Sequence, residues 1–524
     1  MQDFSSVSAE NNSAYNGELS NFFKAPREFS ATDSVWGWIC LFLGYLFCRS
    51  FPAFSKPLYS LIFIILLYAS TTVMLVLKKA KFGKAAICVA ASGLLTAVSL
   101  FLSGNQIIHI FASGYAIFAY CYFVAAATEN RIEGGISSYI LIDFLKAVFI
   151  IPFSGVGGIF AAMFSKKNKL SSVMGKVILG VIIAIVPTAV VFSLLSFDSG
   201  FLNLLSKIFD FNLNNLFGQV VSIIFALPTG AYIFRLFVSS FDKSAKQTIT
   251  LANCKSASEQ VEFAPLITVI TATLPLLFIY VVFFISQWKY YVSGFLRELP
   301  ENVNYATYAR DGFFQLLAVS AINLAVIAAI GLFAKKKSKA GKLSIKILNV
   351  IICVFTLILI STAVSKLVLY IDEHGLTPKR VHAFWFMMVL TLIFIAVILK
   401  QFIAKIKLIP IALVITVVMF FALSVSGSEA LIAKYNVDRY LEGNLDKIIV
   451  SDLEKLGDAA LPQYIRLEKE LEKRREAAPT FYEFEESYDH QLLTELEVAI
   501  NNYSTNYDWY ETTLPKLLAD SALE

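Results

Sequence analysis

The sequence predicts an all-α fold: a polytopic bundle of about eleven transmembrane helices, followed by a small, helical, water-soluble C-terminal domain. Of its 524 residues, 57% are hydrophobic and 16% are charged, and the mean hydropathy is +0.67. Soluble proteins average about 45–50% apolar and about 25% charged residues. The surplus of apolar side chains must therefore face lipid, so we expect an integral membrane protein with the bilayer as its main partner.

Apolar stretches of about 17–25 residues can cross roughly 30 Å of hydrocarbon as helices. Eleven such stretches are predicted as membrane spans, at residues 34–51, 57–77, 85–103, 107–127, 175–197, 217–241, 265–288, 313–334, 344–371, 382–404 and 408–425. A further apolar run, 138–164, contains Asp143 and Lys146. Its charges favour an interfacial or re-entrant helix over a span.

Lys and Arg in short loops predict the orientation of the chain, because cytoplasmic loops are enriched in them. Alternate loops are basic, and they carry Lys78, Lys79, Lys81, Lys84, Arg131, Lys166, Lys167, Lys169, Lys243, Lys246, Lys255, Lys335, Lys336, Lys337, Lys339, Lys342, Lys405 and Lys407. The intervening loops are poor in charge, although those around 289–312 and 372–381 carry a few basic residues. The N-terminus is therefore predicted to be cytoplasmic and, with eleven spans, the C-terminal tail extracytoplasmic; an even number of spans would reverse the side of the tail.

Three domains follow from these predictions: a disordered cytoplasmic arm (1–33), a transmembrane helical domain (34–426) and an acidic, helical tail domain (427–524). The tail contains 21 Asp and Glu against 10 Lys and Arg. Apolar residues recur at three- and four-residue spacing over 446–460 and 461–478, which predicts two helices, with Pro462 placed to start the second and Pro479 to end it.

Two basic residues inside predicted spans, Arg235 and Lys366, are candidates for functional intramembrane charges. Each lies near the end of its span, where long basic side chains commonly extend to the headgroups, so anchoring is the alternative. Pro187, Pro228 and Pro275 also fall inside spans. Such residues mark discontinuous helices in many transporters, although they also occur as simple kinks.

The connector from Asp372 to His382 gathers two histidines beside Asp372 and Glu373. These side chains are plausible ligands for a first-row metal, but their spacing matches no known metal motif. Gly375 and Pro378 favour a solvated turn between helices instead. Another motif, Tyr308 to Phe314, leads into a span and places Arg310 and Asp311 at the N-terminus of a helix, where the macrodipole suits the aspartate and disfavours the arginine.

Several motifs together resemble a widespread bacterial family of multi-pass membrane proteins that is catalogued only as a domain of unknown function. They are Tyr308-Ala309-Arg310-Asp311-Gly312-Phe313-Phe314, Gly375-Leu376-Thr377 with Arg380, Asn436-Val437-Asp438-Arg439-Tyr440, and Asp458-Ala459-Ala460-Leu461-Pro462. The resemblance covers roughly 210–465 and implies a bacterial membrane protein with an extracytoplasmic helical tail. It implies no reaction, substrate or cofactor.

Combined with the charge bias, the resemblance locates these motifs on the predicted outer face. We therefore expect a non-enzymatic envelope, signalling or ligand-binding protein of the bacterial cell membrane, with the outer loops and tail as the working face. The candidates for binding an extracytoplasmic protein or small molecule are Tyr308, Arg310, Asp311, Asp372, Glu373, Thr377, Arg380 and Arg439.

A secondary transporter or permease is the alternative function. An enzyme is less favoured, because the sequence contains no H-E-x-x-H, G-x-S-x-G or P-loop motif. No metal or other cofactor is expected. The formal charge of +5 is too small to suggest binding to nucleic acid.

Overall fold

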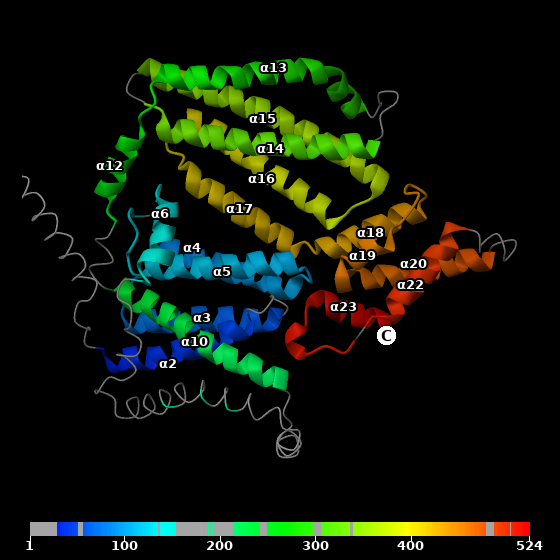
Figure 1. Cartoon of the computed structure of the whole chain (residues 1–524), viewed down its shortest axis with the longest axis horizontal. Coiled ribbons are helices and arrows are strands. Elements are labelled where there is room, and N and C mark those ends of the chain that lie inside the picture. Colours follow the sequence, from blue (N-terminus) through cyan, green and yellow to red (C-terminus); the bar gives the residue numbers. More distant parts are fainter. Residues whose placement is uncertain are drawn as a thin grey trace, which may run out of the picture. The chain divides into compact units, whose positions relative to one another are not determined.

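The computed structural model describes residues 29–50, 56–134, 137–153, 213–241, 249–296, 305–335, 339–477, 487–503 and 505–524, together with residues 180, 187 and 191. In these residues the regular secondary structure is helical, apart from an isolated bridge between Ala264 and Ala334 (Figure 1). Ten of the described helices are long and apolar enough to cross a membrane. The predicted all-α, polytopic fold is therefore confirmed.

Those ten helices match ten of the eleven predicted spans. They lie in α2 (Ala31–Ser50), α3 (Pro57–Leu77), α4 (Lys84–Leu102), α5 (Gln106–Ala127), α10 (Leu213–Ser240), α13 (Leu266–Leu296), α14 (Tyr305–Phe333), α15 (Lys339–His374), α16 (Pro378–Phe402) and α17 (Leu408–Val425). The eleventh, 175–197, lies outside the described residues except at three positions. The orientation of the chain, which depends on that span, stays a prediction.

The chain divides into two compact units. The first comprises residues 1–97, 110–135 and 141–249, and the second comprises 98–109, 136–140 and 250–524. The predicted arm, 1–33, lies outside the described residues up to Phe29. The division into arm, membrane domain and tail is a separate prediction that these two units do not test.

In the first unit, α2 and α10 cross with their backbones in close contact. A Cβ atom added at Gly44 would lie 2.4 Å from the carbonyl oxygen of Ala226, and one added at Gly230 would lie 2.7 Å from that of Cys40. Trp36 and Phe237 pack nearby, with ring centroids 5.0 Å apart. Small residues permit such approaches between membrane helices, so these two glycines set how closely α2 and α10 pack.

The described part of the predicted 138–164 segment forms a short helix, α6 (Ile140–Leu145), which a π-helical turn, η2 (Lys146–Ile150), continues. Asp143 and Lys146 are both buried there. The Asp143 carboxylate accepts a hydrogen bond from the backbone N–H of Ile132, at 2.7 Å. Residues 154–164 lie outside the described residues, so the preference for an interfacial or re-entrant segment over a span stays a prediction.

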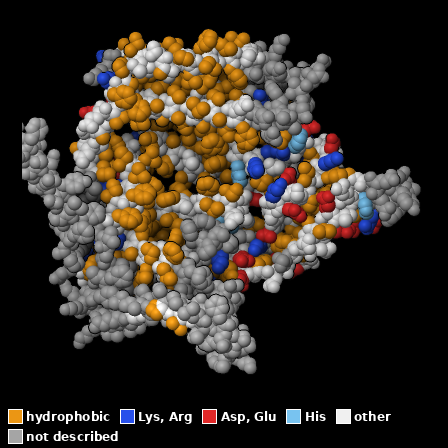
Figure 2. All heavy atoms as spheres, viewed as in Figure 1, with side chains coloured by type: hydrophobic (Ala, Val, Ile, Leu, Met, Phe, Trp, Pro, Cys, Tyr) orange, Lys and Arg blue, Asp and Glu red, His pale blue; other side chains and the backbone are white. Residues whose placement is uncertain are grey.

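In the second unit, α13 to α17 form a bundle with an apolar interior and an apolar surface. Met387 and Phe394 are fully buried in its core, whereas Ile267 and Ile285 on α13 are 72% and 70% exposed. Figure 2 shows hydrophobic side chains covering this bundle, and charged side chains concentrated over the tail. An exposed apolar surface of this extent is what a lipid-facing bundle requires.

A buried polar chain links three helices of this bundle. The Tyr280 hydroxyl donates to the side-chain oxygen of Asn323, and the Asn323 amide donates to the Thr356 hydroxyl at 2.8 Å. Thr356 in turn donates to the carbonyl of Ile352 at 2.7 Å. Each member is hydrogen-bonded, so this chain stabilises the packing of α13, α14 and α15.

The helices do not break at the two prolines that the structure describes within spans. Pro228 lies inside α10 and Pro275 inside α13, and both helices continue through these residues. Pro187 is described only as a single helical residue. Discontinuous helices, which would have supported a transporter, are therefore absent from α10 and α13.

The tail folds around its own core. In the described part of the tail, the helices are α18 (Ser428–Leu441), α19 (Val450–Glu454), η3 (Gly457–Ala460), α20 (Leu461–Ala477), α22 (Tyr488–Asn501), η4 (Trp509–Glu511) and α23 (Leu514–Leu523). Leucines of several of these helices, including Leu453, Leu467, Leu471 and Leu496, are buried against one another. Hydrophobic burial of this kind stabilises a folded domain rather than a flexible extension.

The prediction of one continuous tail helix over 446–460 is wrong. The 446–460 region forms two short helices, α19 and η3, because Gly457 adopts a left-handed conformation with φ of +62°. Glycine reaches this conformation at little cost, and it interrupts an α-helix. The second predicted helix, 461–478, agrees closely with α20.

Candidate functional site

The connector between α15 and α16 is a tight turn built around Gly375. Helix α15 ends at His374, and Gly375 has φ of +73°, with its N–H bonded to the carbonyl of Ile371 at 2.8 Å. A Cβ atom at this position would lie 2.6 Å from the side-chain oxygen of Asn436. Both the positive φ and this close approach require glycine, so Gly375 brings the connector against α18.

Asn436 fixes the connector to the tail. Its side-chain oxygen accepts from the backbone N–H of Leu376 at 2.7 Å, and its amide donates to the carbonyl of Leu376 at 2.9 Å. Asn436 is buried, and Leu376 and Val381 also pack against the tail core. A single side chain thus satisfies both backbone groups of one connector residue, which would otherwise be costly to bury.

Arg439 makes a second link, one turn further along α18. Its guanidinium lies 3.1 Å from the carboxylate of Asp372 and donates to the Asp372 carbonyl at 3.2 Å. It also donates to the carbonyl of Asn444 at 3.0 Å and to the hydroxyl of Tyr435 at 3.3 Å. Multiple charge-assisted hydrogen bonds hold a guanidinium more firmly than one exposed ion pair does.

Arg380 binds the end of α15. It donates to the carbonyls of His374, at 2.9 Å, and of Gly375, and its guanidinium lies 4.2 Å from the ring centroid of Tyr370. A cation near a helix C-terminus is favoured by the macrodipole and satisfies carbonyls that lack partners within the helix. We call residues 370–380 and 435–444, with the contacts within and between them, the joint.

The joint brings together four of the predicted binding residues: Asp372, Thr377, Arg380 and Arg439. Thr377 precedes α16 and contributes its carbonyl, which accepts from the N–H of Arg380 and of Val381, while its side chain forms no capping bond. Glu373 is exposed beside them. Arg380 and Arg439 are already bonded within the protein, so Glu373 is the exposed charged residue among these predicted binding residues.

The remaining candidates lie away from the joint or are only partly described. Helix α14 begins at Tyr305, so Tyr308, Arg310 and Asp311 lie in its first two turns; their side chains are outside the described residues. Lys366 and Arg235 are partly buried in α15 and α10, and both have interaction partners.

Glu429 is a buried carboxylate that is not among the site residues predicted from the sequence. It is 3% exposed in the first turn of α18, and its Oε1 atom accepts no hydrogen bond from the described residues. His382 on α16 lies close enough for the two side chains to interact electrostatically. An acidic residue directly after the last apolar span was the available signal, and the helix macrodipole favours a negative charge at this end.

A second polar cluster connects α23 to the rest of the tail. The hydroxyl of Tyr507 donates to the carboxylate of Asp520 at 2.5 Å, and Lys516 lies 4.4 Å from the centroid of the Tyr507 ring. Burial raises the pKa of the nearby Asp458 carboxyl above its ordinary value; Lys516 acts in the opposite direction, and Asp520 adds to the rise. The folded tail therefore disfavours the ionised form of Asp458.

Replacing Asp458 with asparagine should stabilise the protein at neutral pH. Because the pKa of Asp458 is raised on folding, the folded state binds the proton more tightly than the unfolded state does. The ionised carboxylate therefore lowers the stability of the folded state, and this loss is fully present above the folded pKa. The gain should shrink as the pH falls towards 3.8, the unperturbed value. Thermal unfolding of the detergent-solubilised chain across this range checks the prediction.

Asp446→Asn is the matched control, because Asp446 is an exposed carboxylate of the same domain. Asp446→Asn removes one negative charge, as Asp458→Asn does, but from an exposed position. If Asp458→Asn gave no greater stabilisation at neutral pH than Asp446→Asn, or if its gain persisted below the unperturbed pKa, the burial argument would be wrong.

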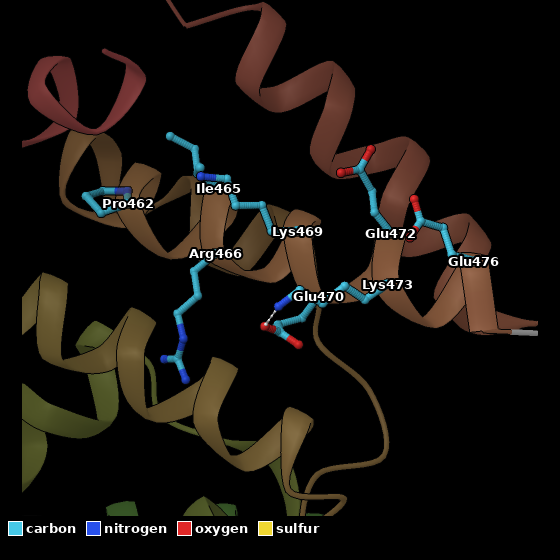
Figure 3. Close-up of a pocket in the computed structure, with 8 residues that line it drawn as sticks. All are labelled: Pro462, Ile465, Arg466, Lys469, Glu470, Glu472, Lys473 and Glu476. Carbon is cyan, nitrogen blue, oxygen red and sulfur yellow. Dashed lines mark hydrogen bonds and ion pairs between the residues drawn. The ribbon is translucent and has the colours of Figure 1, made fainter.

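One surface groove of about 510 Å³ lies along α20 (Figure 3). All of its lining residues belong to that helix: Pro462, Ile465, Arg466, Lys469, Glu470, Glu472, Lys473 and Glu476. Arg466 extends towards α18, where it pairs with Asp438 at 2.5 Å, and Lys473 pairs with Glu470 at 2.7 Å. The opposite face of α20 is buried in the tail core, so this charged face is the exposed side of an amphipathic helix.

Within the described part of the chain, no three His, Cys, Asp or Glu side chains gather closely enough to hold a metal ion. The connector histidines take other positions: the ring of His374 packs against Tyr370, with centroids 4.9 Å apart, and His382 faces Glu429. In the joint, the polar side chains therefore bond mainly to backbone groups of the two segments, and the Glu373 carboxylate is exposed.

A comparison with protein families finds one matching family model, Domain of unknown function (DUF4153), over residues 90–467. This match spans most of the chain, from α4 to the middle of α20, and includes every residue of the joint. No curated protein matches the chain, and no solved structure matches it.

Proposed function

We propose that this chain, which belongs to the DUF4153 family, is a non-enzymatic binding protein of a membrane, whose tail domain captures a protein partner and transmits that event to the membrane helices. The observation that carries the proposal is the joint. Asn436 and Arg439 fix α18 to the α15–α16 connector through four contacts, two with the backbone of Leu376 and two with Asp372.

A tail joined in this way can act on the membrane helices. The same turn that receives Asn436 ends α15 and begins α16, so a displacement of α18 moves the ends of two spans. Glu429 adds a buried carboxylate at the start of α18, next to His382 of α16. Packed, contiguous connections of this kind can carry energetic coupling between sites.

The charged face of α20 is the surface that we assign to the partner. Its groove presents three basic and three acidic side chains along one helix face, and a mixed set of charges favours a polypeptide of complementary pattern over a simple ion. The acidic excess of the tail would further select partners that carry basic residues. An extracytoplasmic partner follows if the predicted orientation holds.

A photo-crosslinking amino acid at Lys469 tests this proposal in intact cells that express the full chain. We expect one discrete adduct when the crosslinker replaces Lys469. The adduct should disappear when Glu472 and Glu476 are also replaced by lysine in the same chain. The matched control is the same crosslinker at Glu442, an exposed tail residue outside the groove, where no adduct should form.

The transporter alternative makes a different prediction. Purified chain in liposomes should then move a solute or ion along an applied gradient, and the α20 substitutions should leave that flux unchanged. Absence of the Lys469 adduct together with a measurable flux would overturn the binding-protein proposal. The uninterrupted helices α10 and α13 argue against this alternative in the described residues.

A further inference from the structure

The C-terminal helix, α23, lies beside the end of two membrane helices. The short connector between α4 and α5 contains Gly104, and a Cβ atom at Gly104 would lie 3.9 Å from the side chain of Pro515, the second residue of α23. Residues 98–109 belong to the same compact unit as the tail. Because α4 and α5 are apolar helices of spanning length, their connector marks a boundary of the bilayer.

Two other ends of membrane helices meet the tail. Helix α17 ends at Val425 and α18 begins at Ser428, and the α15–α16 connector is bonded to Asn436. The tail is therefore attached directly to the ends of α15, α16 and α17. A domain attached to the ends of spanning helices lies next to the membrane surface.

Helix α23 exposes apolar side chains although it belongs to a charged domain. Leu517 and Leu518 are 45% and 53% exposed, whereas Ala519, which follows Pro515 by four residues and shares its helix face, is fully buried. The exposed leucines therefore lie to the side of the helix face that contacts the α4–α5 connector. They form an apolar surface of α23 directly beside that contact.

An aromatic pair precedes this helix. Trp509 is 57% exposed in η4, and its ring packs edge to face against Tyr510, with centroids 5.8 Å apart. Trp and Tyr are enriched where membranes meet water, because their rings combine an apolar body with a polar group. The exposed Trp509 and the leucines of α23 form the lipid-binding combination of an interfacial helix.

We propose that α23 is an interfacial helix that inserts Leu517 and Leu518 into the headgroup region of the bilayer, and that it fixes the C-terminal end of the tail to the membrane. Charge attraction to anionic lipid is not the driving force, because α23 carries one lysine against Asp520 and the terminal Glu524. The apolar side chains drive the contact instead. This inference does not depend on the partner proposed for α20.

Spin labelling at position 518 tests this inference on the full chain reconstituted in phosphatidylcholine nanodiscs. The six native cysteines are first replaced by serine or alanine, and Leu518→Cys carries the nitroxide. We expect the label to collide frequently with oxygen, which partitions into lipid, and to lose collisions with a water-soluble nickel complex. A label at Val418, exposed on α17, gives the reference for lipid, and one at Lys473, exposed on α20, gives the reference for water.

Each outcome decides the inference. Oxygen and nickel accessibilities at 518 that resemble those at Val418, or lie between the two references, support it. Accessibilities that equal those at Lys473 place α23 in water and overturn it. Low accessibility to both reagents means that protein, such as a second copy of the chain, covers the leucines, which also overturns it.

If the label at 518 disturbs folding, the variant Leu518→Asp provides a second measurement. In nanodiscs it should accelerate amide exchange in α23 relative to the unmodified chain, while exchange in the buried part of α20 stays unchanged. Leu431→Asp is the matched control, because Leu431 is 58% exposed on α18. Equal exchange in α23 for both variants would contradict the proposed insertion.

Discussion

Replacing Asn436 with alanine is expected to loosen the attachment of the tail to the α15–α16 connector while both keep their helices and the Arg439–Asp372 link remains. The substitution removes both hydrogen-bond partners of the Leu376 backbone, which lies in a partly buried turn. Leaving buried backbone groups without partners costs about 1–3 kcal/mol, so amide exchange at Leu376 and in the first turns of α16 should become about 5- to 150-fold faster.

Two further variants show whether the side-chain amide itself is responsible. Asn436→Asp can still accept from the Leu376 N–H but cannot donate to the Leu376 carbonyl, so it should not restore protection. Asn444→Ala is the matched control, because the Asn444 side chain is exposed and bonds only to Glu442 among the described residues. Equal exchange rates in Asn436→Ala and Asn444→Ala would show that Asn436 does not hold the joint.

Replacing Gly44 with alanine should force α2 and α10 apart. The added methyl group would lie 2.4 Å from the carbonyl oxygen of Ala226 and 2.8 Å from the backbone nitrogen of Gly230. Both are backbone atoms, which cannot move aside as a flexible side chain can. Overpacking of this kind costs about 1–3 kcal/mol and occasionally more, and the loss should appear as a lower unfolding temperature of the detergent-solubilised chain.

The matched control is Gly114→Ala on α5, another helix of spanning length, because a Cβ atom there would meet nothing within 4 Å. Alanine is a better helix former than glycine by roughly 0.5–1 kcal/mol, so this control should be neutral or stabilising. If Gly44→Ala tolerated heating as well as Gly114→Ala, the close crossing of α2 and α10 would be wrong.

The membrane helices could be predicted from the sequence because the bilayer sets a minimum length of apolar helix, which residues such as those of 57–77 and 408–425 meet in full. Their ends could not be predicted from hydropathy alone. Helix α14 begins at Tyr305 and α15 at Lys339, well before the apolar runs, because a helix continues into the polar interface without losing its hydrogen bonds.

The joint was only partly accessible to sequence reasoning. Motif positions and loop charges identified Asp372, Arg380 and Arg439 as candidates. They did not indicate that Arg380 would donate to the carbonyl of His374 and Arg439 to the carbonyl of Asn444. Asn436 was overlooked as a site residue because one polar residue in an amphipathic helix looks the same whether it is buried or exposed. Its role depends on a contact sixty residues away.

Glu429 illustrates the same difficulty. A glutamate in the first turn of a helix is a common and favourable arrangement. The 3% exposure of Glu429 depends on tertiary packing, which no local pattern encodes. The break at Gly457 had a local signal, since glycine inside a helical pattern weakens that prediction. The apolar periodicity on both sides of Gly457 outweighed it.

The central claim, that the tail and the α15–α16 connector form one working face outside the cytoplasm, is tested most directly by cysteine accessibility in intact cells. In a cysteine-free background, Ser451→Cys in the tail, Glu373→Cys in the connector and Lys342→Cys in a predicted cytoplasmic loop all place the thiol at an exposed position. A membrane-impermeant maleimide should label positions 451 and 373 in intact cells, and position 342 only after permeabilisation. Labelling of 342 in intact cells, with protection of both 451 and 373, would contradict the account.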